Sequence, residues 1–377
     1  MSEPLRILIS SYSYPPMLGG MERQTHLLAR SLVVRGHRVR VLTARFAGLL
    51  AREQLDGVEI ERIALGPGDR WTRMGGYLAR LSAALLLQRE FAQLVQVQQT
   101  FYPAAAAALA TLPLRIPLVV SNRGSGPEGG IALMRSLPLG RVVLGLLRRR
   151  ATCIVTNDEM DQEMREEGFS RLVRIPNGVE MPMPHDGRDE ARRALGLTGS
   201  VVLFLARLEP VKRVELLLRA WARAPRPAST LLVVGEGAER PLVERAVKDA
   251  APDRLVRFDG PTNDAARYFR AADLFVLPSI TEGLSNALLE ALAHALPAIA
   301  SDISGNRQIL SRPDLGLLVP PEDEAALSTA ITHLLVAPDE ARRLGAAARE
   351  HVARSFSVDA MVDAHEQLYR RLLRRES

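Results

Sequence analysis

The chain has 377 residues, a length that fits two domains of about 150–200 residues better than a single core. Hydrophobic residues make up 47% and charged residues 24%, a globular balance that excludes wholesale disorder and fibrous classes. The net charge of +6 comes from the first half, because residues 1–183 hold 23 Arg against 16 acidic residues, and the remainder is nearly neutral.

Seven of these arginines, against a single Glu, fall between Arg115 and Arg150. Such a cluster suits a phosphate-rich or membrane-surface partner, although a solvated face of an Arg-rich protein explains it equally well. The lone cysteine, Cys153, excludes an intramolecular disulfide and a Cys-cluster metal site, and it suits a reducing compartment. The first residues resemble no signal peptide, so we expect a cytoplasmic protein.

In chain order, the pattern of apolar residues in the first half predicts short buried strands that alternate with helices. Strands are expected at residues 6–12, 37–44, 57–64, 94–98, 116–122 and 153–157, and helices at about 22–35 and from Trp71 to Leu85. The uncharged stretch from Phe91 to Leu114 is predicted to be a strand followed by an Ala-rich helix. It contains four Gln and two Pro, which argue against a membrane span.

After a Pro- and Gly-rich linker near residues 180–190 the alternation begins again. Strands are expected at residues 200–208, 229–237, 254–260, 273–279, 296–301 and 316–320. The pattern therefore predicts an α/β fold of two doubly wound parallel sheets, with ligands bound beyond the carboxyl ends of the strands.

The segment "PSITEGLSNALLEALAHALP" (278–297) contains the strongest functional signal. A polar loop leads from a strand into a helix, so the backbone amides of Gly283, Leu284 and Ser285 are expected at a helix N-terminus, which favours anions. Glu282 precedes that terminus, and Glu290 lies roughly 12 Å further along the helix. The two carboxylates suit hydroxyl groups at the two ends of an elongated ligand, with a phosphate between them; a helix with an ordinary acidic face is the alternative.

Two loops add weaker signals. In "ARLEPVKR" the cations Arg207 and Lys212 follow a strand and suit a diphosphate, although many basic loops are simply solvated. In "SYSYPPMLGGMER" Gly19 and Gly20 open a helix and allow a ligand close to the backbone, or they form an ordinary turn. The spacing is not that of a dinucleotide fingerprint, and no metal-ligand spacing occurs.

Taken together, the motifs resemble those of a known protein family. "SYSYPPMLGGMERQ", "RGHRVRVLT", "VRIPNGVE", "FLARLEPVKR", "VVGEG", "ADLFVLPSITEGLSNALLEALAHALP" and "GLLVPPED" resemble, in order and spacing, the retaining GT-B glycosyltransferases marked by Glu-x7-Glu, often numbered family four. The resemblance implies an acceptor-binding Rossmann-like domain at 1–183, a nucleotide-sugar-binding one at 184–355, and a C-terminal helix at 356–377 that crosses back to the first domain. The two domains would face a cleft.

The resemblance also implies roles for single residues. Arg207 and Lys212 match the cations on the donor diphosphate, Glu282 the acid on the sugar hydroxyls, and Glu290 the acid on the ribose. Gly283, Leu284 and Ser285 match the loop that presents backbone amides, and Gly19 and Gly20 match the glycines that close over the diphosphate. No cofactor, metal or nucleic-acid partner is implied.

The chain departs from the family at the sugar and acceptor side. Asn122 and Arg123 occupy the neighbourhood where many members carry a His, and Gln96 and Gln98 replace a His-x-His. We therefore treat Asn122 and Arg123 as candidate sugar or acceptor contacts.

Two functions follow as hypotheses: a nucleotide-sugar-dependent transferase acting on a lipid-linked, polysaccharide or small-molecule acceptor, and a non-catalytic nucleotide-sugar-binding protein with the same fold. The segment 137–150 is predicted to place Leu139, Val142, Val143, Leu146 and Leu147 on one helical face. Arg141 and Arg148 are expected on another face, and Arg149 and Arg150 at the end of the helix. This helix either packs in the core or rests on the inner face of an anionic membrane in a cell-envelope role.

Overall fold

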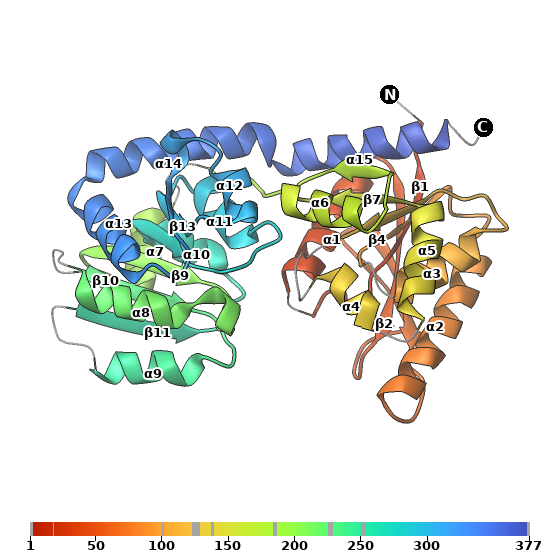
Figure 1. The fold of residues 1–377 in the computed structure, drawn as a ribbon, viewed down its shortest axis with the longest axis horizontal. Helices are drawn as coiled ribbons and strands as arrows, with labels where there is room; N and C mark the ends of the chain where they lie inside the picture. Colours follow the sequence, from red (N-terminus) through yellow and green to blue (C-terminus); the bar gives the residue numbers. More distant parts are fainter. Residues whose placement is uncertain are drawn as a thin grey trace. The chain divides into compact units, whose positions relative to one another are not determined.

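The computed structural model describes residues 3–17, 19–99, 102–122, 129–136, 139–183, 187–224, 229–249 and 254–374. The chain divides into two compact units, the first formed by Met1–Gly178 together with Val358–Ser377, and the second by Val179–Ser357 (Figure 1). The boundaries expected from the sequence, 183/184 and 355/356, lie five and two residues from these divisions.

The described residues of unit 1 form an eight-stranded sheet in the order β3-β4-β2-β1-β5-β6-β7-β8. Its pairs are parallel except β3 with β4, an antiparallel hairpin at the edge that the sequence analysis did not predict. The strands are β1 (Arg6–Ser10), β2 (Arg38–Arg45), β3 (Arg52–Leu55), β4 (Val58–Ala64), β5 (Leu94–Val97), β6 (Leu118–Ser121), β7 (Ala151–Val155) and β8 (Leu172–Arg174).

Helices cover both faces of this sheet, and each face has its own hydrophobic core. Apolar side chains of α2 to α6 fill one core, and those of α1 and α15 fill the other. The helices are α1 (Gly20–Val34), α2 (Arg70–Leu87), α3 (Tyr102–Thr111), α4 (Gly130–Ser136), α5 (Gly140–Arg150), α6 (Asp158–Glu166) and α15 (Val358–Leu373).

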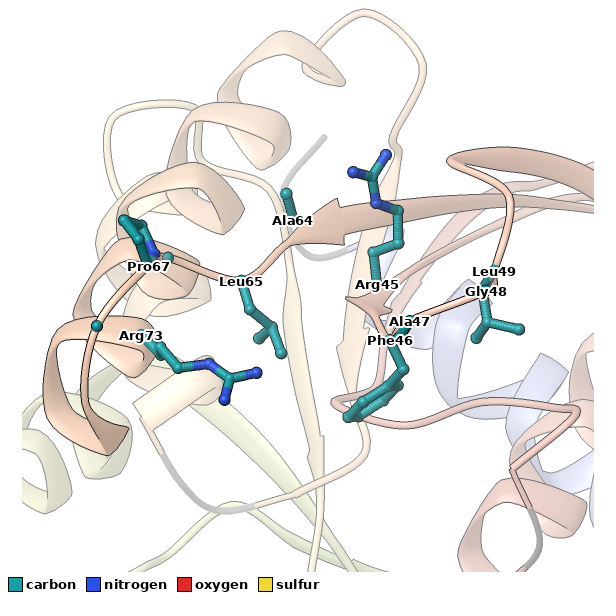
Figure 2. Close-up of a pocket in the computed structure, with 11 residues that line it drawn as sticks. Arg45, Phe46, Ala47, Gly48, Leu49, Ala64, Leu65, Pro67 and Arg73 are labelled. Carbon is teal, nitrogen blue, oxygen red and sulfur yellow. The ribbon is translucent and has the colours of Figure 1, made fainter.

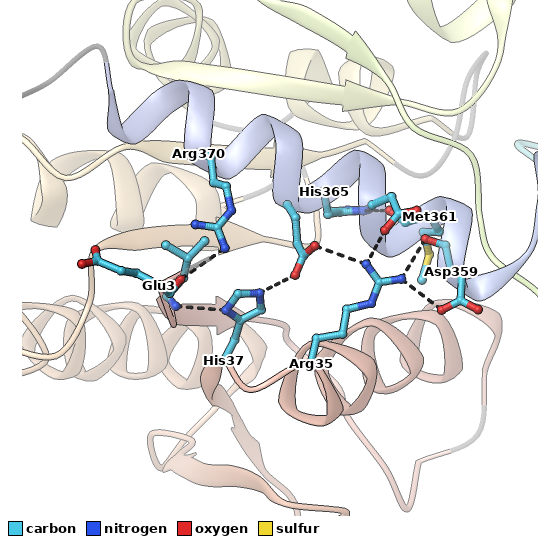
Figure 3. A network of polar contacts seen from close by, with 10 residues as sticks. Glu3, Arg35, His37, Asp359, Met361, His365 and Arg370 are labelled. Atoms are coloured by element: carbon cyan, nitrogen blue, oxygen red, sulfur yellow. Dashed lines mark hydrogen bonds and ion pairs between the residues drawn. The ribbon is translucent and has the colours of Figure 1, made fainter. Parts of the chain in front are cut away.

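Helix α15 is separated from the rest of unit 1 by nearly 180 residues of chain, yet polar contacts tie it to the end of α1 and to the segments before β1 and β2 (Figure 3). Arg35, at the end of α1, pairs with three acids of α15, Asp359 at 3.0 Å, Glu366 at 3.2 Å and Asp363. His37 accepts a hydrogen bond from the Leu5 amide through Nδ1 (3.0 Å) and contacts Glu366 through Nε2.

The uncharged stretch forms strand β5 and the Ala-rich helix α3, as predicted. Among the described residues, no helix is long and apolar enough to cross a membrane.

The predicted apolar face of α5 is only partly buried: Leu147 lies in the unit 1 core, and Val143 and Leu146 are partly buried against it. Leu144 and Leu147 are fully buried in the unit 1 core, whereas Leu139 and Val142 are 74% and 67% exposed. The helix has apolar residues on more than one side, and the side centred on Leu144 packs inward, since Leu144 and Leu147 are one turn apart. Arg141 and Arg149 are exposed, while Arg148 lies 3.7 Å from Glu167.

The described residues of unit 2 form a six-stranded parallel sheet in the order β11-β10-β9-β12-β13-β14. The strands are β9 (Ser200–Leu205), β10 (Ser229–Val234), β11 (Arg254–Gly260), β12 (Leu274–Leu277), β13 (Ala298–Ser301) and β14 (Leu317–Val319). The helices are α7 (Arg188–Leu195), η2 (Pro210–Lys212), α8 (Val214–Arg223), α9 (Arg240–Asp249), α10 (Ala265–Ala271), α11 (Asn286–Ala293), α12 (Ser304–Ile309), η3 (Pro313–Leu315), α13 (Glu324–Val336) and α14 (Pro338–Ser355).

Unit 2 also has one core on each face of its sheet. Helices α8, α9 and α13 pack on one face, and α7, α10, α11 and α12 pack on the other, as the α/β alternation in the sequence predicted. Strand β9 lies between β10 and β12 and is parallel to both. The loops that follow β9 and β12 therefore begin at the same edge of the sheet, the carboxyl edge.

Candidate functional site

The loop after β9 carries Arg207 and Lys212. Arg207 is 73% exposed and lies 4.0 Å from Glu209, which is at the limit of an ion pair. Lys212 ends the short helix η2, and its amide donates to the Glu209 carbonyl at 2.8 Å. The sequence therefore places both cations on one loop, but only Arg207 extends into solvent.

The loop after β12 meets this basic loop directly. Nζ of Lys212 lies 2.5 Å from Oε1 of Glu282, and the two side chains are only 15% and 10% exposed. The hydroxyl of the buried Ser279 donates to the same Glu282 oxygen at 2.8 Å, and the Ile280 amide donates to the Val211 carbonyl at 2.9 Å. Glu282 and Lys212, 70 positions apart, thus form one charged unit at the carboxyl edge of the sheet.

Helix α11 begins directly after Glu282, Gly283 and Leu284. Ser285 is its N-cap, and its hydroxyl accepts a hydrogen bond from the Leu288 amide at 3.3 Å. The side chain of Leu284 is buried in the core, so this residue offers only its backbone to the site. Glu290 lies in the second turn of α11 and is partly buried.

Three glycines shape this edge, a role that the sequence did not indicate. Gly235 and Gly237 have φ values of 149° and 156°, and a Cβ on either would overlap the backbone of residues 206–208. The amide of Leu208 donates to the Glu236 carbonyl at 2.8 Å, which holds the Arg207 loop in place. A Cβ on Gly305, in α12, would lie 2.5 Å from the Glu282 carbonyl oxygen.

A carboxyl group beside the basic loop has an unusual environment. Burial, and next the nearby Glu215 carboxylate, raises the pKa of Glu239 above its ordinary value, and the Glu239 amide donates to the Leu208 carbonyl at 2.8 Å. The sequence offered no signal for this residue beyond its place in "GEGAER".

In unit 1, Gly19 is the N-cap of α1 and Gly20 is its first residue. The Glu22 carboxylate folds back against Gly19 and accepts a hydrogen bond from the Ser13 hydroxyl. A Cβ on Gly19 would overlap this carboxylate, so glycine permits the close approach.

The loop before Gly19 is held by polar side chains for which the sequence offered no functional signal. Tyr14 is 1% exposed, and its hydroxyl lies 2.8 Å from Nδ1 of His26, whose Nε2 lies 2.8 Å from Asp56. Burial, and next the Asp56 carboxylate, raises the pKa of Tyr14. Arg62 of β4 donates to the Pro15 carbonyl at 2.7 Å, so side chains from α1 and from β4 both hold this loop.

The residues that replace the family's histidines lie at the carboxyl ends of β5 and β6. Asn122 is 1% exposed, and its backbone N–H donates to the Ile154 carbonyl at 2.9 Å; Arg123 lies outside the described residues. Gln96 is fully buried, donates to the Ser121 hydroxyl at 3.1 Å, and accepts a hydrogen bond from Tyr369 of α15. Gln96 therefore links the sheet to the C-terminal helix.

His294, four residues after Glu290, is a packing residue. Its ring stacks on Phe269 at 5.4 Å, and Nδ1 lies 2.8 Å from the Glu290 carbonyl. Burial, and next the neighbouring Arg270, lowers its pKa. Across the described parts of the chain, no three His, Cys, Asp or Glu side chains are grouped to hold a metal ion.

Comparisons with known proteins agree with this architecture. Residues 199–336 match the family described as glycosyl transferases group 1, and residues 19–178 match the glycosyl transferase 4-like domain, roughly four fifths of the chain together. A glycogen synthase of Mycobacterium tuberculosis (strain CDC 1551 / Oshkosh) is 28% identical over 399 residues, covering 97% of this chain and 94% of that protein.

Two solved structures share the whole fold. Sucrose-phosphate synthase of Thermosynechococcus elongatus has a TM-score of 0.81 at 25% identity, covering 98% of this chain and 100% of that one. HepE of Anabaena, in complex with UDP, has a TM-score of 0.80 at 20% identity, covering 97% and 99%. The chain therefore belongs to the group 1 glycosyltransferases, and its two parallel-sheet α/β units are the two Rossmann-like domains of the GT-B fold.

Proposed function

We propose that this protein moves a sugar from a nucleotide-sugar donor, bound at the carboxyl edge of unit 2, to an acceptor bound by unit 1, with retention at the anomeric carbon. The contact between Lys212 and Glu282 supports the proposal most directly. A cation held at 2.5 Å by a carboxylate, next to the N-cap of α11, suits a ligand that carries both phosphates and hydroxyls.

The proposed sugar transfer requires stabilisation of the charge on the leaving diphosphate and needs no nucleophile from the protein. As the bond between the anomeric carbon and the diphosphate oxygen breaks, negative charge grows on the diphosphate, where Arg207, Lys212 and the amides of the Gly283–Ser285 loop can meet it. The acceptor oxygen bonds to the same face of that carbon, and its proton passes to the departing phosphate oxygen. In this front-face displacement Glu282 binds sugar hydroxyls, Glu290 binds the ribose, and no metal or other cofactor takes part.

The relatives support a donor of this class. Glycogen synthase and sucrose-phosphate synthase are named for building glycosidic products, and HepE, which shares the fold alone, holds UDP. Gly19 and Gly20 would close over the diphosphate from unit 1, and Asn122 and Arg123 would contact the sugar or the acceptor.

The test is a donor screen. We expect one UDP-, GDP- or ADP-sugar to raise the melting temperature and to release its nucleotide when an acceptor is present, equally well in EDTA. The product's anomeric proton, followed by NMR, should keep the donor's configuration. Binding without any nucleotide release would instead indicate the non-catalytic function, and an inverted product would rule out the front-face route.

We also propose that unit 1 rests on the cytoplasmic face of an anionic membrane to reach a lipid-linked or envelope-polysaccharide acceptor. Leu139 and Val142 of the α5 region are 74% and 67% exposed, Leu133 of α4 is 42% exposed, and Arg141 and Arg149 lie exposed on the same helix. Exposed aliphatic side chains beside arginines suit an interface with anionic headgroups, each Arg contributing about 1 kcal/mol at low salt.

Co-sedimentation with liposomes tests this surface. We expect binding to rise with the phosphatidylglycerol content of phosphatidylcholine vesicles, to fall at high salt, and to be lost in Arg141→Glu/Arg149→Glu. The matched control is Arg245→Glu/Arg343→Glu, the same charge change at exposed positions of unit 2. Equal recovery on neutral and anionic vesicles, or equal losses in both variants, would argue for a soluble acceptor.

A further inference from the structure

Unit 1 contains a cavity of about 740 Å³ that none of the residues discussed above explains (Figure 2). It lies where the chain leaves β2 and β4, against the first turns of α2, and Arg45, Phe46, Leu49, Leu65, Pro67 and Arg73 are among the residues that line it. The volume is in the range of sites that bind small organic ligands.

The lining carries two positive charges and no acidic residue. Figure 2 shows Arg45 extending from the end of β2 and Arg73 extending from α2, with Leu65 lying between them. Both side chains are exposed, and neither guanidinium has a hydrogen-bond or ion-pair partner among the described residues.

Three arginines of β2, β3 and β4 differ in this respect. Arg40 pairs with Glu59, Arg62 lies 2.6 Å from Glu53, and Arg52 lies 3.4 Å from Glu61. Arg45 and Arg73 thus bring two positive charges to the cavity without a counterion among the described residues, an arrangement that suits an anion.

The backbone around the cavity is fixed rather than loose. The Gly66 amide donates to the Arg73 carbonyl at 3.3 Å, and a Cβ on Gly66 would lie 3.0 Å from the Thr72 carbonyl oxygen. The Asp69 carboxylate caps α2 by accepting from the Thr72 amide at 2.8 Å. The first turn of α2 thus has its own acceptor, so a bound anion would be held by the guanidinium groups.

An aromatic wall completes the cavity. The ring of Phe46 packs edge-on against Tyr12 with 5.9 Å between centroids, and Tyr12 packs in the same way on Tyr77 at 5.4 Å. A ring held in this way can contact the apolar face of a sugar or polyol.

The cavity lies at the edge of the sheet where the acceptor is expected. Strand β2 is the direct neighbour of β1, whose following loop leads to Gly19 and Gly20. The Ala44 amide donates to the Tyr12 carbonyl at 3.1 Å, which joins that loop to the end of β2.

We propose that this cavity binds a phosphoryl group of the acceptor, with Arg45 and Arg73 on the phosphate oxygens and Phe46 against the adjoining sugar or polyol. The inference rests on the proposed function, because it names the class of acceptor that unit 1 would take. A soluble sugar or polyol phosphate and a phospholipid headgroup share this chemistry.

Direct binding to the donor-free protein tests the site. The probes are inorganic phosphate, glycerol 3-phosphate and glucose 6-phosphate, measured by calorimetry and ³¹P NMR, and phosphatidylcholine vesicles with or without phosphatidate. We expect at least one phosphate probe to bind, glycerol and glucose not to compete, and Arg45→Gln and Arg73→Gln each to weaken binding about tenfold, as loss of a charge-assisted contact predicts. Binding of soluble phosphates points to a soluble acceptor, and binding of phosphatidate vesicles alone points to a lipid headgroup.

The matched control is Arg89→Gln, the same change at an exposed position beyond the far end of α2, about 24 Å along the helix from Arg73. Failure of every phosphate probe to bind, or equal binding to wild type and to both cavity variants, would overturn the inference. Donor binding is measured on the same proteins and should be unchanged in all of them. If no nucleotide-sugar binds the wild type, the proposed function fails, whatever the phosphate probes show.

Discussion

Lys212→Met should lower the turnover of the donor about 10²- to 10³-fold, as expected when one preorganised charge is removed from a developing anion. It should also destabilise unit 2, because Lys212 is only 15% exposed and is the cation paired with Glu282. Its loss removes a cation that contacts Glu282 at 2.5 Å where both side chains are largely buried, which costs about 1–3 kcal/mol of unfolding free energy. Steady-state nucleotide release and thermal unfolding measure the two effects.

The double variant Lys212→Met/Glu282→Gln separates the two effects. We expect it to recover most of the lost stability and none of the turnover, because the amide needs no cation. The matched control is Lys248→Met, since Lys248 is the other lysine of the chain and lies exposed in the last turn of α9. Recovery of turnover in the double variant would show that Lys212 acts only by neutralising Glu282.

The two glutamates should divide the donor between them. Glu290→Gln is expected to weaken binding of the bare nucleotide about tenfold, because it removes a charged partner of the ribose hydroxyls. Glu282→Gln should leave the bare nucleotide within about twofold and weaken the intact nucleotide-sugar about tenfold or more. Calorimetry with both ligands measures the difference.

An exposed acid that contacts neither loop serves as the control for both variants. Glu350→Gln, on α14, removes the same charge at a side chain that is 71% exposed. If Glu290→Gln and Glu282→Gln bind the bare nucleotide equally well, the ribose assignment is wrong.

Much of the fold could be predicted from the sequence because buried parallel strands are short, apolar runs between helices. Edge strand β3 was not predicted because its sequence, "REQL", has no β-branched residue. Its side chains alternate between exposed and partly buried, so it lacks the apolar run of a buried strand. The buried face of α5 was predicted only in part, because a helix rich in Val and Leu offers several apolar faces, and only its neighbours α3 and α4 select the one that is buried.

The site could be predicted less completely. The residue types and their positions after strands suggested Arg207, Lys212, Glu282 and Glu290, but not that two of them touch. The contact between Lys212 and Glu282 depends on β12 lying beside β9, and the order of strands in a sheet is a tertiary property. Arg45 and Arg73 were not predicted for the same reason, since the end of β2 and the first turn of α2 meet only because β4 pairs with β2.

The way α15 completes unit 1 has a consequence for biosynthesis. The chain leaves unit 1 at Gly178, forms the whole of unit 2, and returns at Val358, where the Val179 amide bonds to the Phe356 carbonyl at 2.8 Å. Until α15 has been synthesised, the apolar face that receives Met361, Leu368 and Tyr369 stays open, and Gln96 and Arg35 lack their partners on that helix. Unit 2 can therefore fold on the ribosome before unit 1 is finished. A fragment ending at Gly178 would expose apolar surface and behave as an aggregation-prone intermediate rather than as an independent domain.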